Sequence, residues 1–117
     1  MVEARVRRKR LGAGMRQVGI LAAAGLHALD HHVERLADDH ENARLLAEAC
    51  GVDPATVDTN IVAFDSADAP GFVAAAREAG VLISAVGART VRMVTHLDVT
   101  RADAESAAAA LAGLSPR

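Results

Sequence analysis

The chain has 117 residues, of which 51% are hydrophobic and 2% aromatic, and its formal net charge is -2. This length allows a real core, but without Trp or Tyr the core must be filled mainly by alanine and leucine. The weak net charge and the missing aromatic stacking surfaces argue against a nucleic-acid-binding protein. No apolar run is long enough to span a bilayer and no secretory signal is visible, so we expect a cytoplasmic protein without a membrane partner.

The first ten residues form a basic segment in which five cations accompany a single acid, Glu3. The cations are Arg5, Arg7, Arg8, Lys9 and Arg10. Such a run is typical of a solvated helix face or a flexible arm. A nucleic-acid-binding arm stays open as an alternative interpretation, because dense cations release counterions from phosphate backbones.

A glycine turn follows the basic segment. Gly12 and Gly14 lead into an apolar run, and Arg16 is expected just inside the helix that this run forms. Glycines, a helix start and an arginine together favour a phosphate or carboxylate site. The alternative is an ordinary turn with a surface arginine, since short glycine motifs often occur without function.

The pattern predicts a buried helix over residues 14–30, because almost no polar face interrupts it. Its glycines, Gly19 and Gly25, suit close approach of a neighbouring backbone, so we expect this helix to pack against further protein or a partner subunit. An amphipathic helix is predicted over residues 31–49, ending before Gly51. Cys50, the only cysteine, is interpreted as a small core residue at this helix end.

The second half of the chain reads as strands and helices in alternation. Strands are predicted over residues 56–65, 81–84 and 91–95, where β-branched residues gather. A helix is expected between Pro70 and Gly80, with Ala79 on its inner face, and a last helix begins after the cap Thr100. The predicted fold class is α+β, a small antiparallel sheet with helices packed on one face.

Two sets of side chains are candidates for chemistry. Arg92 lies in an otherwise apolar strand, where a buried guanidinium would need an anionic partner; the alternative is an arginine on the solvent face. His27 and His31 share a helix face, but no further ligand is fixed by spacing, so we predict no metal site. His96 follows a strand end and is interpreted as a hydrogen-bonded structural residue rather than a proton shuttle.

Four stretches occur in an order that resembles the low-specificity L-threonine aldolases, pyridoxal-phosphate enzymes of the aspartate-aminotransferase-like fold type I. They are residues 7–17, 38–43, 59–62 and 91–99. The most specific pieces are Gly-Ala-Gly-Met-Arg-Gln at 12–17 and Val-Thr-His-Leu-Asp at 94–98. The chain departs from the family at Ala13, where a third glycine is common.

The resemblance implies a role for three residues. Arg92 matches the family position that binds the carboxylate of the amino-acid substrate. Lys9 and Arg16 match positions that reach the phosphate of pyridoxal phosphate, in the active site of a neighbouring subunit, which implies a homo-oligomer, a dimer or tetramer. Residues 1–17 then correspond to the end of the large cofactor domain, and residues 18–117 to the C-terminal small domain.

The resemblance also implies a reaction, the retro-aldol cleavage of L-threonine or L-allo-threonine to glycine and acetaldehyde. Pyridoxal-phosphate chemistry needs a lysine that carries the cofactor. The one lysine here, Lys9, lies among arginines and does not match that position. We therefore expect a fragment without catalytic residues of its own, inactive alone. The competing hypothesis is a stand-alone dimerising interaction module with a basic arm for nucleic acid or an acidic protein.

Overall fold

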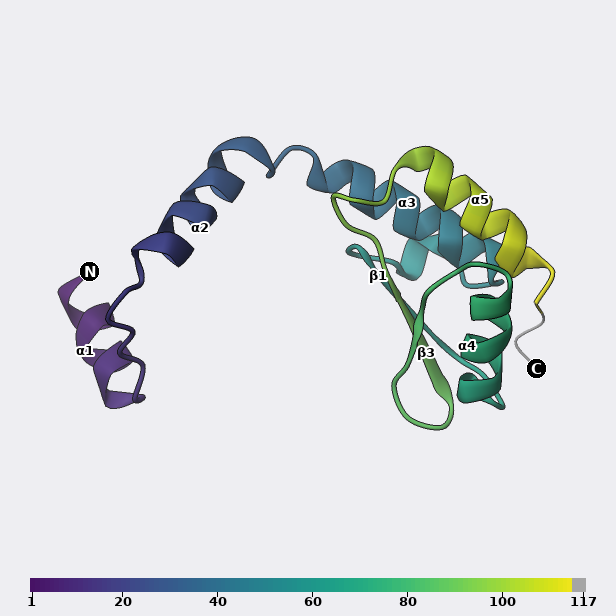
Figure 1. Cartoon of the computed structure of the whole chain (residues 1–117), viewed down its shortest axis with the longest axis horizontal. Coiled ribbons are helices and arrows are strands. Elements are labelled where there is room, and N and C mark those ends of the chain that lie inside the picture. The colour runs from purple at the N-terminus through teal and green to yellow at the C-terminus, as the bar shows by residue number, and fades with distance from the viewer. Residues whose placement is uncertain (115–117) are drawn as a thin grey trace. The chain divides into compact units, whose positions relative to one another are not determined.

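The computed structural model describes residues 1–114 and divides the chain into two units, Met1–Glu34 and Arg35–Arg117. Within the described residues it contains five α-helices, a short 3-10 helix and a three-stranded antiparallel sheet (Figure 1). This confirms the α+β class. The two units are separated where few contacts cross between their residues. The boundary expected between residues 17 and 18 is a boundary between domains of a longer protein, so it stays a prediction.

The first unit holds two helices, α1 (Val2–Arg10) and α2 (Gly19–His31), and none of their residues is buried. The prediction of a buried helix from residue 14 is therefore wrong within this chain in two respects. The turn after Gly12 continues to Val18, so α2 starts later, and its apolar side chains have no partner in the unit. Arg16 consequently precedes the helix instead of lying inside it.

The second unit holds α3 (Leu36–Ala49), the 3-10 helix η1 (Pro54–Thr56), α4 (Ala69–Glu78) and α5 (Arg101–Ala112), together with the sheet. Its strands are β1 (Ile61–Asp65), β2 (Ser84–Ala85) and β3 (Thr90–Val94), in the order β1-β3-β2. Helices α3 and α5 run side by side (Figure 1).

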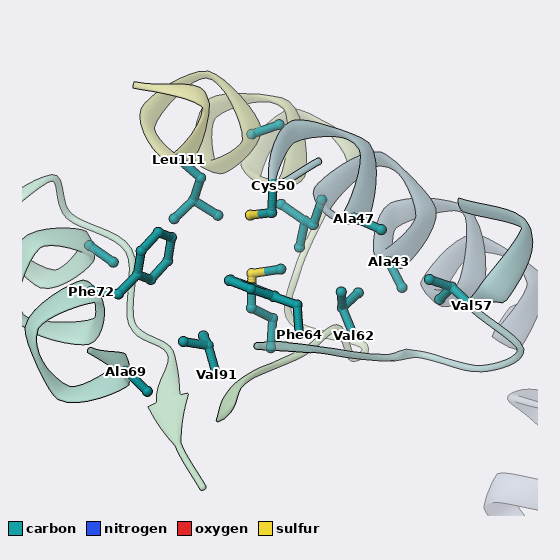
Figure 2. Close-up of a cluster of buried hydrophobic side chains, with 14 residues drawn as sticks. Ala43, Ala47, Cys50, Val57, Val62, Phe64, Ala69, Phe72, Val91 and Leu111 are labelled. Atoms are coloured by element: carbon teal, nitrogen blue, oxygen red, sulfur yellow. The ribbon is translucent and has the colours of Figure 1, made fainter. Parts of the chain in front are cut away.

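The core lies between one face of the sheet and helices α3, α4 and α5. Alternation along β1 and β3 turns Val62, Phe64, Val91 and Met93 inward. Figure 2 shows side chains from the helices, among them Cys50, Phe72 and Leu111, gathered about Phe64 of β1. Phe64 and Phe72 meet edge to face, with ring centroids 5.4 Å apart. The prediction that helices cover one face of the sheet is confirmed.

Cys50 is a member of this core, as the sequence suggested. Burial raises the pKa of its thiol to about 11, because the thiolate would lose its hydration. The residue is therefore a protonated, apolar filler under ordinary conditions rather than a nucleophile.

The sheet is smaller than predicted. The segment expected to be a strand from residue 56 begins with η1, where Asp53 accepts a hydrogen bond from the Ala55 amide and Pro54 starts the turn. The predicted strand over 81–84 pairs only at Ser84 and Ala85. Ala79, expected to face inward, is exposed. The β-propensity of residues 56–65 and 81–84 correctly indicated extended or apolar segments. Where a strand starts is decided by hydrogen-bonded pairing with a neighbouring strand.

Cap signals in the sequence were reliable. Pro70 lies in the first turn of α4, and Gly80, just beyond that helix, takes a positive φ of 84° that suits glycine. Thr100 and Asp103 form a capping box at α5. The Asp103 amide donates to Thr100 Oγ1 (3.2 Å), and the Thr100 hydroxyl and amide donate to Asp103 Oδ2 (2.6 and 3.0 Å).

This capping box predicts a specific pH dependence of stability. Hydrogen bonds from the Thr100 hydroxyl and amide hold the pKa of Asp103 below its usual value. A lowered native pKa adds stability above the unfolded value of about 3.9, and this stability is lost as the pH falls through the native pKa. Urea unfolding between about pH 5 and pH 2 should therefore show a shallower loss for Asp103→Asn than for the native chain. Thr100→Val should reproduce that shallower slope, and parallel curves for all three proteins would contradict the assignment.

Candidate functional site: an open sheet face and a basic glycine turn

The face of the sheet that the helices of the second unit leave uncovered carries Arg92 on its central strand. Arg92 pairs in register with Ala63 of β1 and Ser84 of β2, and its side chain is exposed. Ile61 and Val94, which face each other across the same two strands, are each about half exposed beside it. The guanidinium is thus the cation at the middle of a partly apolar open surface.

The sequence left open whether the Arg92 guanidinium is buried with an anionic partner or lies on the solvent face, and the structure shows that it is exposed. Alternation turns Val91 and Met93 into the core and Arg92 outward, so its charge is not desolvated by this chain. Within residues 1–114 it forms no ion pair. Its planar fork is therefore available to an external carboxylate. The substrate role itself stays a prediction.

Thr95, just after β3, fixes the end of the strand that carries Arg92. It is 1% exposed, and its hydroxyl donates to the Asp39 carbonyl of α3 at 2.6 Å. Its amide donates to the Asn60 carbonyl at 3.0 Å, and the Asn60 side-chain amide donates to the Thr95 carbonyl at 2.6 Å. We call this meeting of Asp39, Asn60 and Thr95 the Thr95 junction. It joins three of the stretches that carry the resemblance, residues 38–43, 59–62 and 91–99.

A second set of contacts holds the α3 side of the junction. Arg35 donates two hydrogen bonds to the buried Asp39 carboxylate, at 2.6 and 3.0 Å. This hydrogen bonding raises the pKa of the Arg35 guanidinium further above its usual value, so the arginine stays charged. Asn42 donates to the Val99 carbonyl at 3.3 Å. Sequence reasoning missed these positioning residues, although each is a polar residue within or beside a quoted stretch.

The glycine turn in the first unit brings Lys9 and Gly14 together. A Cβ built at Gly14 would lie 3.3 Å from Lys9 Nζ, a tight contact, so the ammonium lies close over this glycine. Gly12 takes a φ of 78°, whereas no residue other than glycine has a positive φ within residues 1–114. Ala13, where the family commonly has a glycine, therefore does not need the positive φ that glycine allows.

Lys9 and Arg16 are both exposed, and neither forms an ion pair within the part of the chain that the structure describes. Two unpaired cations beside a glycine turn fit a phosphate dianion. Arg92 lies in the other unit, so no geometry links it to these two residues.

The histidines show a different pattern. The ring centroids of His27 and His31 are 4.5 Å apart, and those of His27 and His32 are 5.2 Å apart. No group of three His, Cys, Asp or Glu side chains suited to a metal ion occurs among residues 1–114. His96 is exposed, and its Nδ1 accepts a hydrogen bond from the Asp98 amide at 3.3 Å. Among the described helices, none has the length and apolar character needed to cross a membrane.

The second unit carries an exposed arginine on the uncovered face of its sheet, and the first unit carries a basic glycine turn. Each feature by itself is suited to bind a small anion. Comparison with known proteins identifies the family of the chain. Residues 1–69 match the model of the β-eliminating lyases, and the chain belongs to this family. The family implies pyridoxal phosphate as cofactor.

Individual relatives are more specific. The chain is 48% identical over 101 residues to "Low specificity L-threonine aldolase" of Escherichia coli K12, covering 80% of this chain and 29% of that protein. It is 39% identical over 116 residues to "Probable low-specificity L-threonine aldolase 2" of Arabidopsis thaliana, covering 90% and 33%. The resemblance to the threonine aldolases is confirmed, and the chain spans about a third of the length of these relatives. They lend no support to the stand-alone interaction module.

The Thr95 junction predicts that removal of one hydroxyl, that of Thr95, lowers the stability of the chain. Thr95→Val keeps the shape of the side chain but removes its hydrogen bond to Asp39, and should lower the free energy of unfolding by about 1 kcal/mol. Thr90→Val, at the other end of β3, is the matched control, because no side-chain hydrogen bond of Thr90 occurs within residues 1–114. Urea unfolding of both variants measures the difference, and equal stabilities would refute the junction's contribution.

Proposed function

We propose that the chain is the C-terminal portion of an L-threonine aldolase, and that its second unit is the small domain of a fold type I pyridoxal-phosphate enzyme. The whole enzyme would cleave L-threonine or L-allo-threonine to glycine and acetaldehyde. One observation carries the proposal. In a chain homologous to threonine aldolases, Arg92 lies at the centre of the sheet face that no helix of the second unit covers, and it forms no ion pair within residues 1–114.

In this proposal Arg92 binds the α-carboxylate of the substrate. Two parallel N–H donors of the guanidinium match the two carboxylate oxygens, which fixes both the position and the plane of the amino acid. The half-exposed Ile61 and Val94 flank the site on the same face. Their apolar surface limits water beside the ion pair, and hydrogen bonds are stronger where water is scarce. The Thr95 junction holds the strand that presents the arginine.

Lys9 and Arg16 are proposed to bind the cofactor phosphate of a neighbouring subunit. The position of Lys9 Nζ close to Gly14 and the lack of anionic partners for both cations within residues 1–114 support this assignment. When bound, pyridoxal phosphate supplies the electron sink that cleavage of the Cα–Cβ bond requires. The residues of this chain bind and orient the two anionic ends, and the lysine that carries the cofactor is supplied by another part of the enzyme.

A chimaeric enzyme tests the role of Arg92. This chain would replace the segment of the Escherichia coli aldolase to which it aligns, and acetaldehyde release from L-allo-threonine would be measured. Arg92→Ala should raise KM roughly 10- to 100-fold, because a hydrogen-bonded charge pair is lost. Arg92→Lys should recover only part of that loss, since lysine keeps the charge but not the bidentate fork.

Arg77→Ala is the control for the chimaera, because Arg77 is an exposed arginine near the end of α4, away from the sheet face. It should leave KM unchanged. A folded, cofactor-loaded chimaera without activity would contradict the proposed function, whereas an active one whose KM ignores Arg92→Ala would contradict only the carboxylate role.

The chain by itself should be inactive. Mixed with pyridoxal phosphate, it should develop no visible absorption band of a covalently held cofactor and release no acetaldehyde from L-threonine, because its single lysine lies in the phosphate-binding segment. Absorption spectroscopy and a coupled acetaldehyde assay check both points. A stable band that survives Lys9→Ala would show that the account of the cofactor lysine is wrong.

A further inference from the structure

Three histidines lie close together at the C-terminal end of α2. His27 and His31 are one turn apart in the helix, and the centroids of their rings are 4.5 Å apart. His32 is the cap residue that follows, and its ring centroid is 5.2 Å from that of His27. The spacing in the sequence fixed only two possible ligands, whereas the structure brings a third imidazole to the same helix end.

One nitrogen of this histidine cluster is buried without a partner. His32 Nδ1 is shielded from solvent and has no hydrogen-bond partner within residues 1–114. Buried polar atoms in folded proteins are almost always paired with a protein group, a water molecule or an ion. An unpaired nitrogen beside two further imidazoles therefore indicates that the cluster is suited to an external polar partner.

The charges around the histidine cluster favour a cation as that partner. Asp30 and Glu34 line a hollow of about 270 Å³ together with His31. Neither acid forms an ion pair within residues 1–114, and α2 contains no lysine or arginine. The unpaired carbonyls at the C-terminal end of a helix add a partial negative charge. A positive ion is therefore favoured over an anion at this end of α2.

We propose that His27 and His31 form a binding site for a divalent transition-metal ion that prefers imidazole ligands, such as Zn²⁺. Two histidines four residues apart on one helix face are a known arrangement for binding zinc, because both rings reach the same ion. No group of three side chains suited to a metal ion occurs within residues 1–114. The site therefore has two protein ligands, and water completes the coordination of the ion.

Metal binding at this pair is coupled to the folding of α2. The helix has 13 residues, none of them buried, and an isolated helix of this length is marginal in water. An ion held by His27 and His31 connects two successive turns, and it binds the helical form of the segment better than the unfolded form. The ion should therefore raise the helix content of the first unit. The proposal depends on the first unit alone and is independent of the aldolase assignment.

Isothermal titration calorimetry of the full 117-residue chain with Zn²⁺ tests the proposal, and we expect one ion to bind per chain. His27→Gln and His31→Gln should each raise the dissociation constant roughly tenfold or more, because the second imidazole binds intramolecularly once the first has bound. Far-UV circular dichroism should show that Zn²⁺ raises the helix content of the native chain but not that of either variant.

His96→Gln is the matched control, because His96 is an exposed histidine of the second unit, outside the histidine cluster. It should leave both the dissociation constant and the change in helix content as in the native chain. Mg²⁺ should not displace Zn²⁺, because it prefers oxygen ligands. The proposal is overturned if the native chain shows no saturable Zn²⁺ binding, or if His27→Gln and His31→Gln weaken binding no more than His96→Gln does.

Discussion

The hydroxyl of Thr95 connects the parts of the second unit that the rest of the fold depends on. It joins the first turn of α3 to the end of β3, while Asn60 ties the same point to the start of β1. The edge of β3 that faces β2 is paired only as far as Arg92, at Ser84. The C-terminal part of the strand is therefore held by β1 and by this junction. A buried hydrogen-bonded group of this kind specifies one register, because any slip would leave its polar atoms unpaired.

Local signals predicted the end of α3, both ends of α4 and the start of α5 better than the starts of α2 and α3 or the extent of the sheet. Thr100 with Asp103, Pro70, and the glycines after α3 and α4 act within a few residues of themselves, so their effects can be predicted from the sequence. Strand limits depend on a partner far along the chain. Residues 81–83 have strand-like composition, but only Ser84 and Ala85 pair with β3, which no local pattern shows.

The candidate site likewise contains some residues that the sequence could indicate and others that only the structure shows. The alternation of side chains along β3 could have shown that Arg92 faces away from the core, because the residues on either side of it, Val91 and Met93, are large and apolar. The resemblance drew attention to Arg92, Lys9 and Arg16. Neither approach could find the roles of Asp39, Asn60 and Thr95, because those roles exist only where three distant segments meet. The contact of Lys9 with the Gly14 position likewise depends on how the turn folds back on α1.

The two units differ in what stabilises them, and this difference affects the position of Lys9 and Arg16, the cations proposed to bind phosphate. The second unit has a buried core of its own and exposes Arg92 on the uncovered face of its sheet. The first unit buries nothing, so whatever covers α2 also determines where the adjoining turn is held. Lys9 and Arg16 belong to that turn and to the end of α1, directly before α2. A surface that covers α2 would therefore also position the two cations that are proposed to bind phosphate.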